Sequence, residues 1–293
     1  MFGSETLLFI LVAGLQSAVP LVIAAVGGSF ASQVGVFNLG LEGMMIAGAF
    51  GAFSVAHTTG SVWLGLLGGI AAGLLVAVIF AISTVYFRAD EVVTGFLINL
   101  AMLALTAVLL TALFGATGQL VSTTFGNLPK FGRFDIMMVV AVATVLAAQF
   151  VTYHSRFGLR MRAVGGNPDA AEAVGVHPDQ TRIYALLACG GLAGMAGAYL
   201  PLSGLHMFTI NMTAGAGYIA VAAVLFGVGR PGLVALAALL FGFMGAIAVP
   251  MQRLEMPSEF ALILPYLATL VAVSVKGIIL FRRSHGASEL VAQ

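Results

Sequence analysis

Long runs of apolar residues follow one another along this chain, and polar residues gather in the short stretches between them. A bilayer core about 30 Å thick is crossed by a helix of about 20 mostly apolar residues. Nine runs approach this length, namely 5–27, 41–57, 61–87, 92–114, 135–154, 182–203, 214–228, 231–250 and 259–281. The second and seventh runs are short, so we expect about nine transmembrane helices, within a range of eight to ten. Because polar and apolar residues do not alternate within the runs, they exclude a β-barrel and predict an all-α polytopic membrane protein.

The composition agrees with a membrane protein and excludes two other classes. Of the 293 residues, 60% are hydrophobic and 8% are charged, and the mean hydropathy is +1.09. Soluble domains carry about 25% charged residues, so a water-soluble enzyme is excluded. A formal net charge of +1 provides no basic surface of the kind that binds nucleic acids. The polar stretches are short, so residues 1–293 are predicted to form a single transmembrane domain whose longest loop is 155–182.

The basic residues predict the orientation, because short cytoplasmic loops accumulate Lys and Arg. If loop 155–182 is cytoplasmic, nine of the twelve basic residues lie inside: Arg88, Arg156, Arg160, Arg162, Arg182, Arg230, Lys276, Arg282 and Arg283. Lys130, Arg133 and Arg253 then lie outside. With nine spans this places the C-terminus in the cytoplasm and the N-terminus outside. A ten-span alternative, with a further crossing within 27–43, places the N-terminus inside.

Glycine-rich stretches interrupt the apolar pattern once in each half of the chain, at 27–43 and around the seventh run at 211–232. Non-helical backbone at membrane depth is tolerated only where it is buried in protein or lines water, so such paired interruptions predict a substrate path. The alternative is two ordinary loops that dip into the interface. Glycines also recur every four residues in the third and sixth runs, at Gly65, Gly69 and Gly73 and at Gly190 and Gly194. This spacing predicts close helix packing, either within the chain or between subunits.

Few polar residues fall near the interruptions or within the runs. Glu42 is the one carboxylate beside an interrupted segment, and it follows Asn38 by four residues, which places both on one face if the turn is helical. Alternatively, Glu42 caps the N-terminal dipole of the second run. Asn99 and Gln149 are the polar residues closest to the middle of a run, where they serve as links between helices or as ligand contacts.

The sequence carries no pattern typical of an enzyme or an ion-coupled carrier. The five histidines stand at run ends or in loops without metal-ligand spacing, and the lone Cys189 is interpreted as a small buried hydrophobe. A proton- or sodium-driven carrier usually needs a buried acid or a charge relay. No Gly-x-x-x-x-Gly-Lys-Ser/Thr loop occurs, so ATP is not expected to bind by that route. If transport is active, its energy is therefore expected to enter through another polypeptide.

The polar loop 155–182 contains signals for one short helix. Asn167 is a favourable N-cap, Pro168 suits the first turn, Asp169 opposes the helix dipole and Gly175 suits a left-handed stop. These residues predict a two-turn helix over 168–174. The small alanine side chains give this helix a narrow surface, and arginines flank it in the sequence. Both a helix that docks in a cleft of a partner and a plain linker helix have these features.

Two motifs in this order resemble those of a known family. They are GVFNLGLEGMM at 35–45 and GLRMRAVGGNP at 158–168, the latter followed by AEAVG at 171–175; GYIAVAAVLFG at 217–227 extends the similarity over most of the chain. The chain resembles the membrane permease subunits of bacterial ABC importers, in the nucleoside and simple-sugar branch, which is related to the ribose and branched-chain amino acid permeases. It departs from many relatives in its short N-terminus and in Ser32 and Gln33, where charged residues are common.

The resemblance implies a type II ABC importer permease bundle in the bacterial inner membrane that translocates a nucleoside or simple sugar by alternating access. It implies three partners: a cytoplasmic ATPase that binds ATP and Mg, a second paralogous permease in a heterodimer, and an extracytoplasmic substrate-binding protein or lipoprotein. No cofactor is expected on this chain, and the chain is not expected to be an enzyme.

The resemblance also assigns roles to residues. The helix over 168–174 corresponds to a coupling helix, and the ATPase-coupling residues are Arg160, Arg162, Asn167, Pro168, Glu172 and Gly175. The candidates for the substrate path are Phe37, Asn38, Glu42 and Asn99. Two other classes stay open on the residues alone: a secondary carrier or channel for a small neutral solute, and a membrane-embedded enzyme or scaffold.

Overall fold

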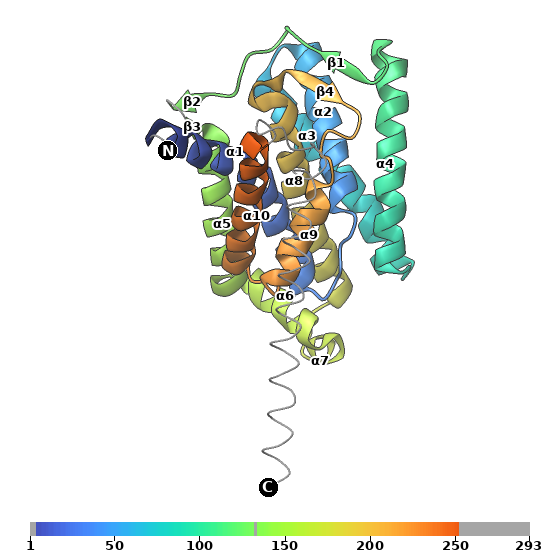
Figure 1. The fold of residues 1–293 in the computed structure, drawn as a ribbon. Coiled ribbons are helices and arrows are strands. Elements are labelled where there is room, and N and C mark those ends of the chain that lie inside the picture. Colours follow the sequence, from blue (N-terminus) through green and yellow to red (C-terminus); the bar gives the residue numbers. More distant parts are fainter. Residues whose placement is uncertain (1–3, 132–133, 252–293) are drawn as a thin grey trace.

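The structure, a computed structural model, describes residues 4–131 and 134–251 as a bundle of helices (Figure 1). The helices are α1 (Ser4–Gln33), α2 (Leu41–Thr59), α3 (Val62–Ala81), α4 (Glu91–Phe114), α5 (Ile136–His154), α6 (Arg156–Gly166), α7 (Pro168–Ala173), α8 (Pro178–Leu200), α9 (Ala216–Phe226) and α10 (Pro231–Met251). Two π-helical turns, η1 (Ile82–Tyr86) and η2 (Pro201–Leu205), extend α3 and α8.

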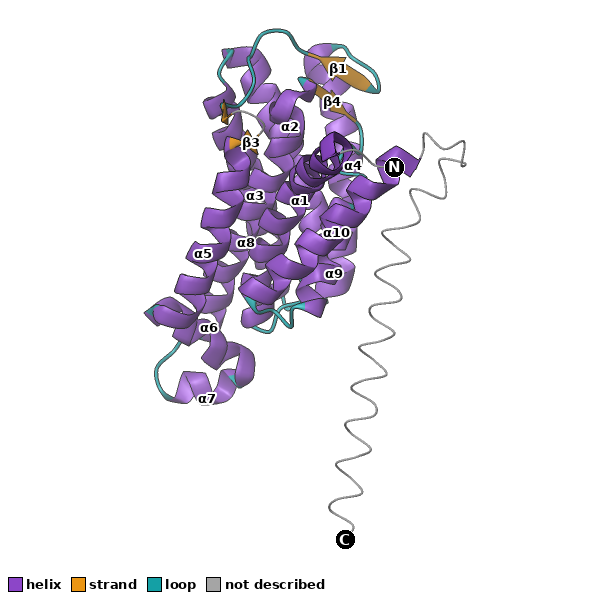
Figure 2. Ribbon diagram, turned by 60° about the vertical axis from the view of Figure 1, so that its left-hand side comes forward, coloured by secondary structure: helices purple, strands orange, loops and turns teal. Residues whose placement is uncertain are grey.

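Two small antiparallel strand pairs complete the described part of the chain. They are β1 (Gln119–Val121) with β4 (Met207–Thr209), and β2 (Lys130–Phe131) with β3 (Phe134–Asp135). Figure 2 shows the strands at one end of the bundle and α6 and α7 at the other. We refer to these as the β1–β4 end and the α7 end.

The predicted all-α membrane fold is confirmed, whereas the count of about nine spans is not. Within the described residues, five helices are long and apolar enough to cross a membrane: Leu11–Gln33, Val62–Tyr86, Glu91–Phe114, Ile136–His154 and Pro178–Leu205. The runs predicted at 41–57, 214–228 and 231–250 also form helices, namely α2, α9 and α10. The ninth predicted run, 259–281, lies outside the described residues.

Two local predictions need correction. The first interruption was expected over 27–43, but α1 continues to Gln33, so that only 34–40 is non-helical. The side-chain amide of Gln33 donates to the carbonyl of Gly229, 2.8 Å away, which fastens the end of α1 to the turn between α9 and α10. In addition, loop 155–182 holds a second helix, α6. Its N-cap Ser155 accepts from the Gly158 amide at 3.0 Å, and its apolar side packs on the bundle.

The predicted glycine spacing brings α3 and α8 into backbone contact. A Cβ added to Gly73 would lie 2.4 Å from the Gly190 carbonyl oxygen, and one added to Gly194 would lie 2.4 Å from that of Gly69. Helices approach this closely only where side chains are absent, and van der Waals packing of this kind associates helices in lipid. The glycines therefore serve packing within the chain, the first of the two predicted alternatives.

We expect Gly194→Ala to lower the free energy of unfolding by roughly 1–3 kcal/mol, because its methyl group would overlap the α3 backbone. Gly191→Ala on the same helix is the matched control, since its added Cβ would meet its nearest neighbour, Leu74, at 3.5 Å. Both changes raise helix propensity equally. Thermal unfolding of the purified proteins in detergent measures the difference, and equal midpoints would contradict the packing.

Candidate functional site

The two interrupted segments meet inside the bundle, where α2 and α9 begin. Helix α9 has 11 residues, so it rises only about 16 Å from the turn at Gly229. Its first turn lies inside the bundle, because Gly217 and the neighbouring Glu42 and Asn99 are buried. There it contacts the first turn of α2, because a Cβ added to Gly217 would lie 2.5 Å from the Cα of Glu42.

The Glu42 carboxylate joins these two helix ends. Its side chain is buried, and Oε1 accepts hydrogen bonds from the Thr213 hydroxyl and from the Gly215 amide at 3.0 Å. Oε2 accepts from the Gly217 amide at 2.6 Å. The first N–H groups of a helix lack partners within the helix and carry the positive end of its dipole, so a carboxylate satisfies both. Glu42 also lies in the first turn of α2, but its hydrogen bonds go to α9. Glu42 was predicted as a possible cap of the second run, which is α2. In the structure it caps the start of the seventh run, which is α9.

Asn99 binds the same junction from α4. Its Oδ1 accepts from the Gly43 amide at 2.7 Å, and its Nδ2 donates to the Leu39 carbonyl at 3.0 Å and the Tyr218 hydroxyl at 3.1 Å. One buried amide thus links α4 to the start of α2, to the segment before it and to α9. We name Glu42, Asn99, Thr213 and Tyr218 the helix-start junction.

Asn38 lies beside this junction but points elsewhere. Its Oδ1 accepts from the Gly40 amide at 2.9 Å, and its Nδ2 faces the Cys189 sulfur at 3.3 Å and the Met44 sulfur at 3.6 Å. The shared face with Glu42 required a helical turn from Asn38 onward, and this condition is not met, because α2 begins only at Leu41. The short polar side chain bonds the backbone two residues on, which favours a turn over a helix.

Phe37 lies apart from the other three predicted path residues. Its side chain is 36% exposed, and its backbone amide donates to the Glu91 carboxylate at the start of α4. The structure therefore brings together Asn38, Glu42 and Asn99 and leaves Phe37 at the edge. Gln149, the other polar residue within a run, accepts from the Gly232 amide at 3.2 Å and links α5 to α10.

The short helix in loop 155–182 is confirmed. The Asn167 side chain accepts from the Ala170 amide at 3.1 Å, Pro168 begins the helix, and Gly175 has φ +84°, the left-handed conformation expected after the last turn. Buried Ala171 fixes α7 to the protein. The apolar Val174 at its end is 78% exposed.

The charged residues predicted for coupling lie at the surface of the α7 end, Arg160 and Arg162 on α6 and Glu172 on α7. Arg160, Arg162 and Glu172 are exposed, and the Arg162 guanidinium stacks over the Tyr153 ring at 5.3 Å. Beside Glu172 lies a polar cleft of about 720 Å³ between α7, the start of α8 and the start of α4, which Glu91, Arg88 and Arg182 also line. The α7 end thus presents an apolar tip within a charged rim.

Sequence reasoning missed Thr213 and Tyr218, the partners of Glu42 and Asn99. The one signal was the glycine-rich stretch 211–217, which marked a broken helix but not its polar contacts. Within the described residues, no group of three or more His, Cys, Asp or Glu side chains could hold a metal ion.

Comparison with known proteins decides the family. Residues 10–273 match the family described as branched-chain amino acid transport system / permease component. The chain belongs to this permease family. It is therefore a multi-pass membrane protein and a transport subunit, in agreement with its apolar helices.

Several curated relatives cover nearly the whole permease. A nucleoside ABC transporter permease protein of Lactococcus lactis subsp. cremoris is 32% identical over 92% of this chain and 93% of its own length. A guanosine ABC transporter permease protein of Bacillus subtilis is also 32% identical, over 92% of each chain. A putative glucose ABC transporter permease protein of Haloferax volcanii is 34% identical over 83% of this chain and 78% of its own. No solved structure matches the chain significantly.

We expect Glu42→Gln to lower the free energy of unfolding of the permease by roughly 1–3 kcal/mol. An amide has only one acceptor oxygen, so it leaves an N–H or hydroxyl donor at the start of α9 facing another donor. Glu172→Gln, on the exposed surface, is the matched control and should keep the wild-type midpoint. Thr213→Ser should also keep it, because the hydroxyl is retained. Thermal unfolding in detergent measures all three, and an unchanged midpoint for Glu42→Gln would contradict the junction.

Proposed function

We propose that this permease is the membrane subunit of an ATP-driven importer that carries a nucleoside into the cell. The observation that carries the proposal is the match to two permeases named for nucleoside and guanosine transport, each over more than nine-tenths of both chains. A simple sugar is the second candidate cargo, favoured by the relative named for glucose. The permease itself needs no bound cofactor in this proposal.

The energy source is proposed to be a cytoplasmic ATPase that binds ATP and Mg. The α7 end supports this, because an apolar tip with a charged rim is the kind of surface that docks into another protein. We propose that α7 is the coupling helix, with Arg160, Arg162 and Glu172 as contacts. Asn167, Pro168 and Gly175 contribute by fixing the two ends of the helix.

The other partners and the orientation complete the proposal. A second paralogous permease would form a heterodimer with this chain, and an extracytoplasmic binding protein or lipoprotein would deliver the cargo. The whole chain, 1–293, would form one transmembrane domain in the bacterial inner membrane. The α7 end, rich in arginine, and the C-terminus would face the cytoplasm.

Movement of the cargo is proposed to follow alternating access, with the helix-start junction beside the path. Two helices that begin inside the bundle are the pattern found where transporters bind and move ligands. Asn38, Glu42 and Asn99 would hold the starts of α2 and α9 in position along the path, and Phe37 would lie at its mouth on the α7 side. A secondary carrier or channel, the competing function, would move solute without ATP.

Uptake of labelled guanosine by a deletion strain that carries the permease gene on a plasmid tests the function. We expect ATP-dependent uptake from the wild-type chain. The double variant Arg162→Glu, Glu172→Arg should lose at least about tenfold in uptake, because reversing both charges opposes docking of the ATPase. Arg156→Glu, an exposed residue on the first turn of α6, is the control and should transport normally.

Copurification of the ATPase with each variant shows whether lost uptake reflects lost docking. Wild-type uptake in the double variant would contradict the coupling role of α7. Solute accumulation by the permease alone in sealed vesicles, without ATP, would favour the secondary carrier instead.

For the path residues, we expect Asn38→Ala to lower the maximal uptake rate roughly tenfold, because the turn before α2 loses its internal hydrogen bond. Gln149→Ala, which removes an amide linking α5 and α10, is the matched control and should change uptake less than about twofold. Initial rates of guanosine uptake at equal permease levels measure both. Unchanged uptake in Asn38→Ala would remove this residue from the path.

A further inference from the structure

A cavity lined in part by polar side chains, which we call the polar cavity, opens in the half of the bundle toward the β1–β4 end. It has a volume of about 790 Å³, within the range of small-molecule sites. Its walls come from α1, the end of α8 with η2, the segment before α9, α9 itself and α10. The polar side chains that line it are Gln16, Ser17, Asp135, Tyr199, Ser203 and Thr213.

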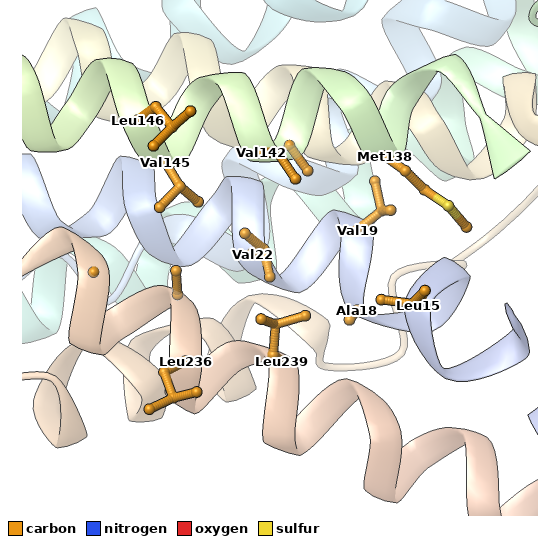
Figure 3. A pocket seen from close by; sticks show the side chains of 13 residues that line it. Leu15, Ala18, Val19, Val22, Met138, Val142, Val145, Leu146, Leu236 and Leu239 are labelled. Carbon is orange, nitrogen blue, oxygen red and sulfur yellow. The ribbon is translucent and has the colours of Figure 1, made fainter. Parts of the chain in front are cut away.

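Its character differs from that of the neighbouring groove between α1, α5 and α10 (Figure 3). There the side chains are all hydrocarbon or thioether, as Leu15, Val22, Met138 and Val142 show. Such a surface suits lipid chains and offers no hydrogen bonds. The polar cavity is therefore the better place for a hydroxyl-bearing solute.

Irregular backbone lies in two walls of the polar cavity. In a third wall, Pro20 removes one backbone hydrogen bond from α1, which stays helical to Gln33. In η2, Gly204 has φ +119°, and before α9, Ala214 has φ +46° in a left-handed conformation that is costly for a residue with a Cβ. Transporters build ligand sites from discontinuous helices, and residues in such sparsely populated conformations cluster at ligand sites.

The walls offer both hydrogen-bonding groups and aromatic rings, which suits a ligand that carries hydroxyl groups and a ring. The Asp135 carboxylate accepts from the Tyr199 hydroxyl at 3.2 Å. The rings of Tyr199 and Phe241 offer apolar surface to a planar base.

The cavity also touches the helix-start junction. Thr213 lines the cavity and donates its hydroxyl hydrogen bond to Glu42. A ligand against Thr213 is thus one hydrogen bond from the carboxylate that joins α2 and α9. Occupancy of the cavity and the position of α9 are therefore physically connected.

We propose that this cavity is a nucleoside-binding vestibule built within a single permease chain, with hydrogen bonds from Ser17, Tyr199 and Ser203 and ring contact from Phe241. The assignment rests on the proposed nucleoside function. It predicts that guanosine occupies the cavity between these residues.

Filling the cavity tests the assignment in the intact importer. A Cβ added to Gly245, which lines the cavity, meets no atom of the described residues within 4 Å, so Gly245→Leu should fold and occupy the ligand's space. We expect its guanosine uptake to fall at least about tenfold at normal membrane levels. Ala143→Leu, on the exposed side of α5, is the control for added bulk in a span and should transport normally.

Thiol labelling tests binding directly. In right-side-out vesicles holding the complete importer, we expect Ser203→Cys to react with a membrane-impermeant thiol reagent, and guanosine to slow that reaction at least about fivefold. Thr59→Cys, exposed at the β1–β4 end and outside the cavity, should react equally with and without guanosine. The unsubstituted chain should stay unlabelled, since Cys189 is fully buried.

The two experiments separate the possible failures. If the unsubstituted importer takes up no nucleoside, the proposed function fails, and the assignment of a nucleoside to the cavity fails with it. If it takes up guanosine while Gly245→Leu transports normally, or while labelling of Ser203→Cys is absent or unaffected by guanosine, only the vestibule assignment is overturned. If Gly245→Leu does not reach normal membrane levels, the labelling result decides.

Discussion

A helix that begins inside a membrane must find partners for its first backbone N–H groups, and this requirement organises the permease. Hydrocarbon supplies no water, so each unsatisfied group costs several kcal/mol. The chain meets the requirement at α9 with one carboxylate, because Glu42 accepts from Gly215, Gly217 and Thr213. The carboxylate accepts three hydrogen bonds and lies at the starts of two helices, where the helix dipoles favour a carboxylate. The scarcity of charged residues in the runs is therefore compatible with a buried acid.

The remaining helices give this junction a rigid frame. Helices α2, α3 and α8 approach to backbone contact through glycines, as between Gly73 and Gly190 and between Gly48 and Gly194. Closely packed backbones resist local rearrangement, because no side chain can change rotamer to accommodate a shift. By contrast, α4 exposes much of its apolar surface, including Val108 and Leu113, and is held to the bundle by the Asn99 hydrogen bonds. The polar link matters more for α4 than for the buried helices.

Local signals in the sequence predicted the helices and their ends. They could not predict which residues far apart in the sequence are in contact. The apolar runs placed eight helices, and Asn167, Pro168 and Gly175 fixed α7, because capping depends on neighbours in the chain. Thr213 lies 171 residues from Glu42, and no periodicity connects two such positions. The end of α1 was misplaced for a related reason. Glycines at 27 and 28 indicated a break, but the structure uses them for close contacts with α8, α2 and α9 inside a continuous helix.

The contacts around α9 suggest how the α7 end and the vestibule influence each other. At its start, α9 is held by Glu42; at its end, the Gly229 carbonyl accepts from Gln33 at the end of α1. That same end of α1 lies against α6, since a Cβ at Gly165 would overlap the Gln33 carbonyl. Helix α6 leads directly into α7 through Asn167. A displacement of α7 by a docked partner would therefore pass to α1 through the Gly165–Gln33 backbone contact, and from the Gln33 side chain to the turn that follows α9. Because Glu42 fastens the opposite end of α9 to α2, α9 would tilt rather than slide, and Thr213 beside the vestibule would move with it.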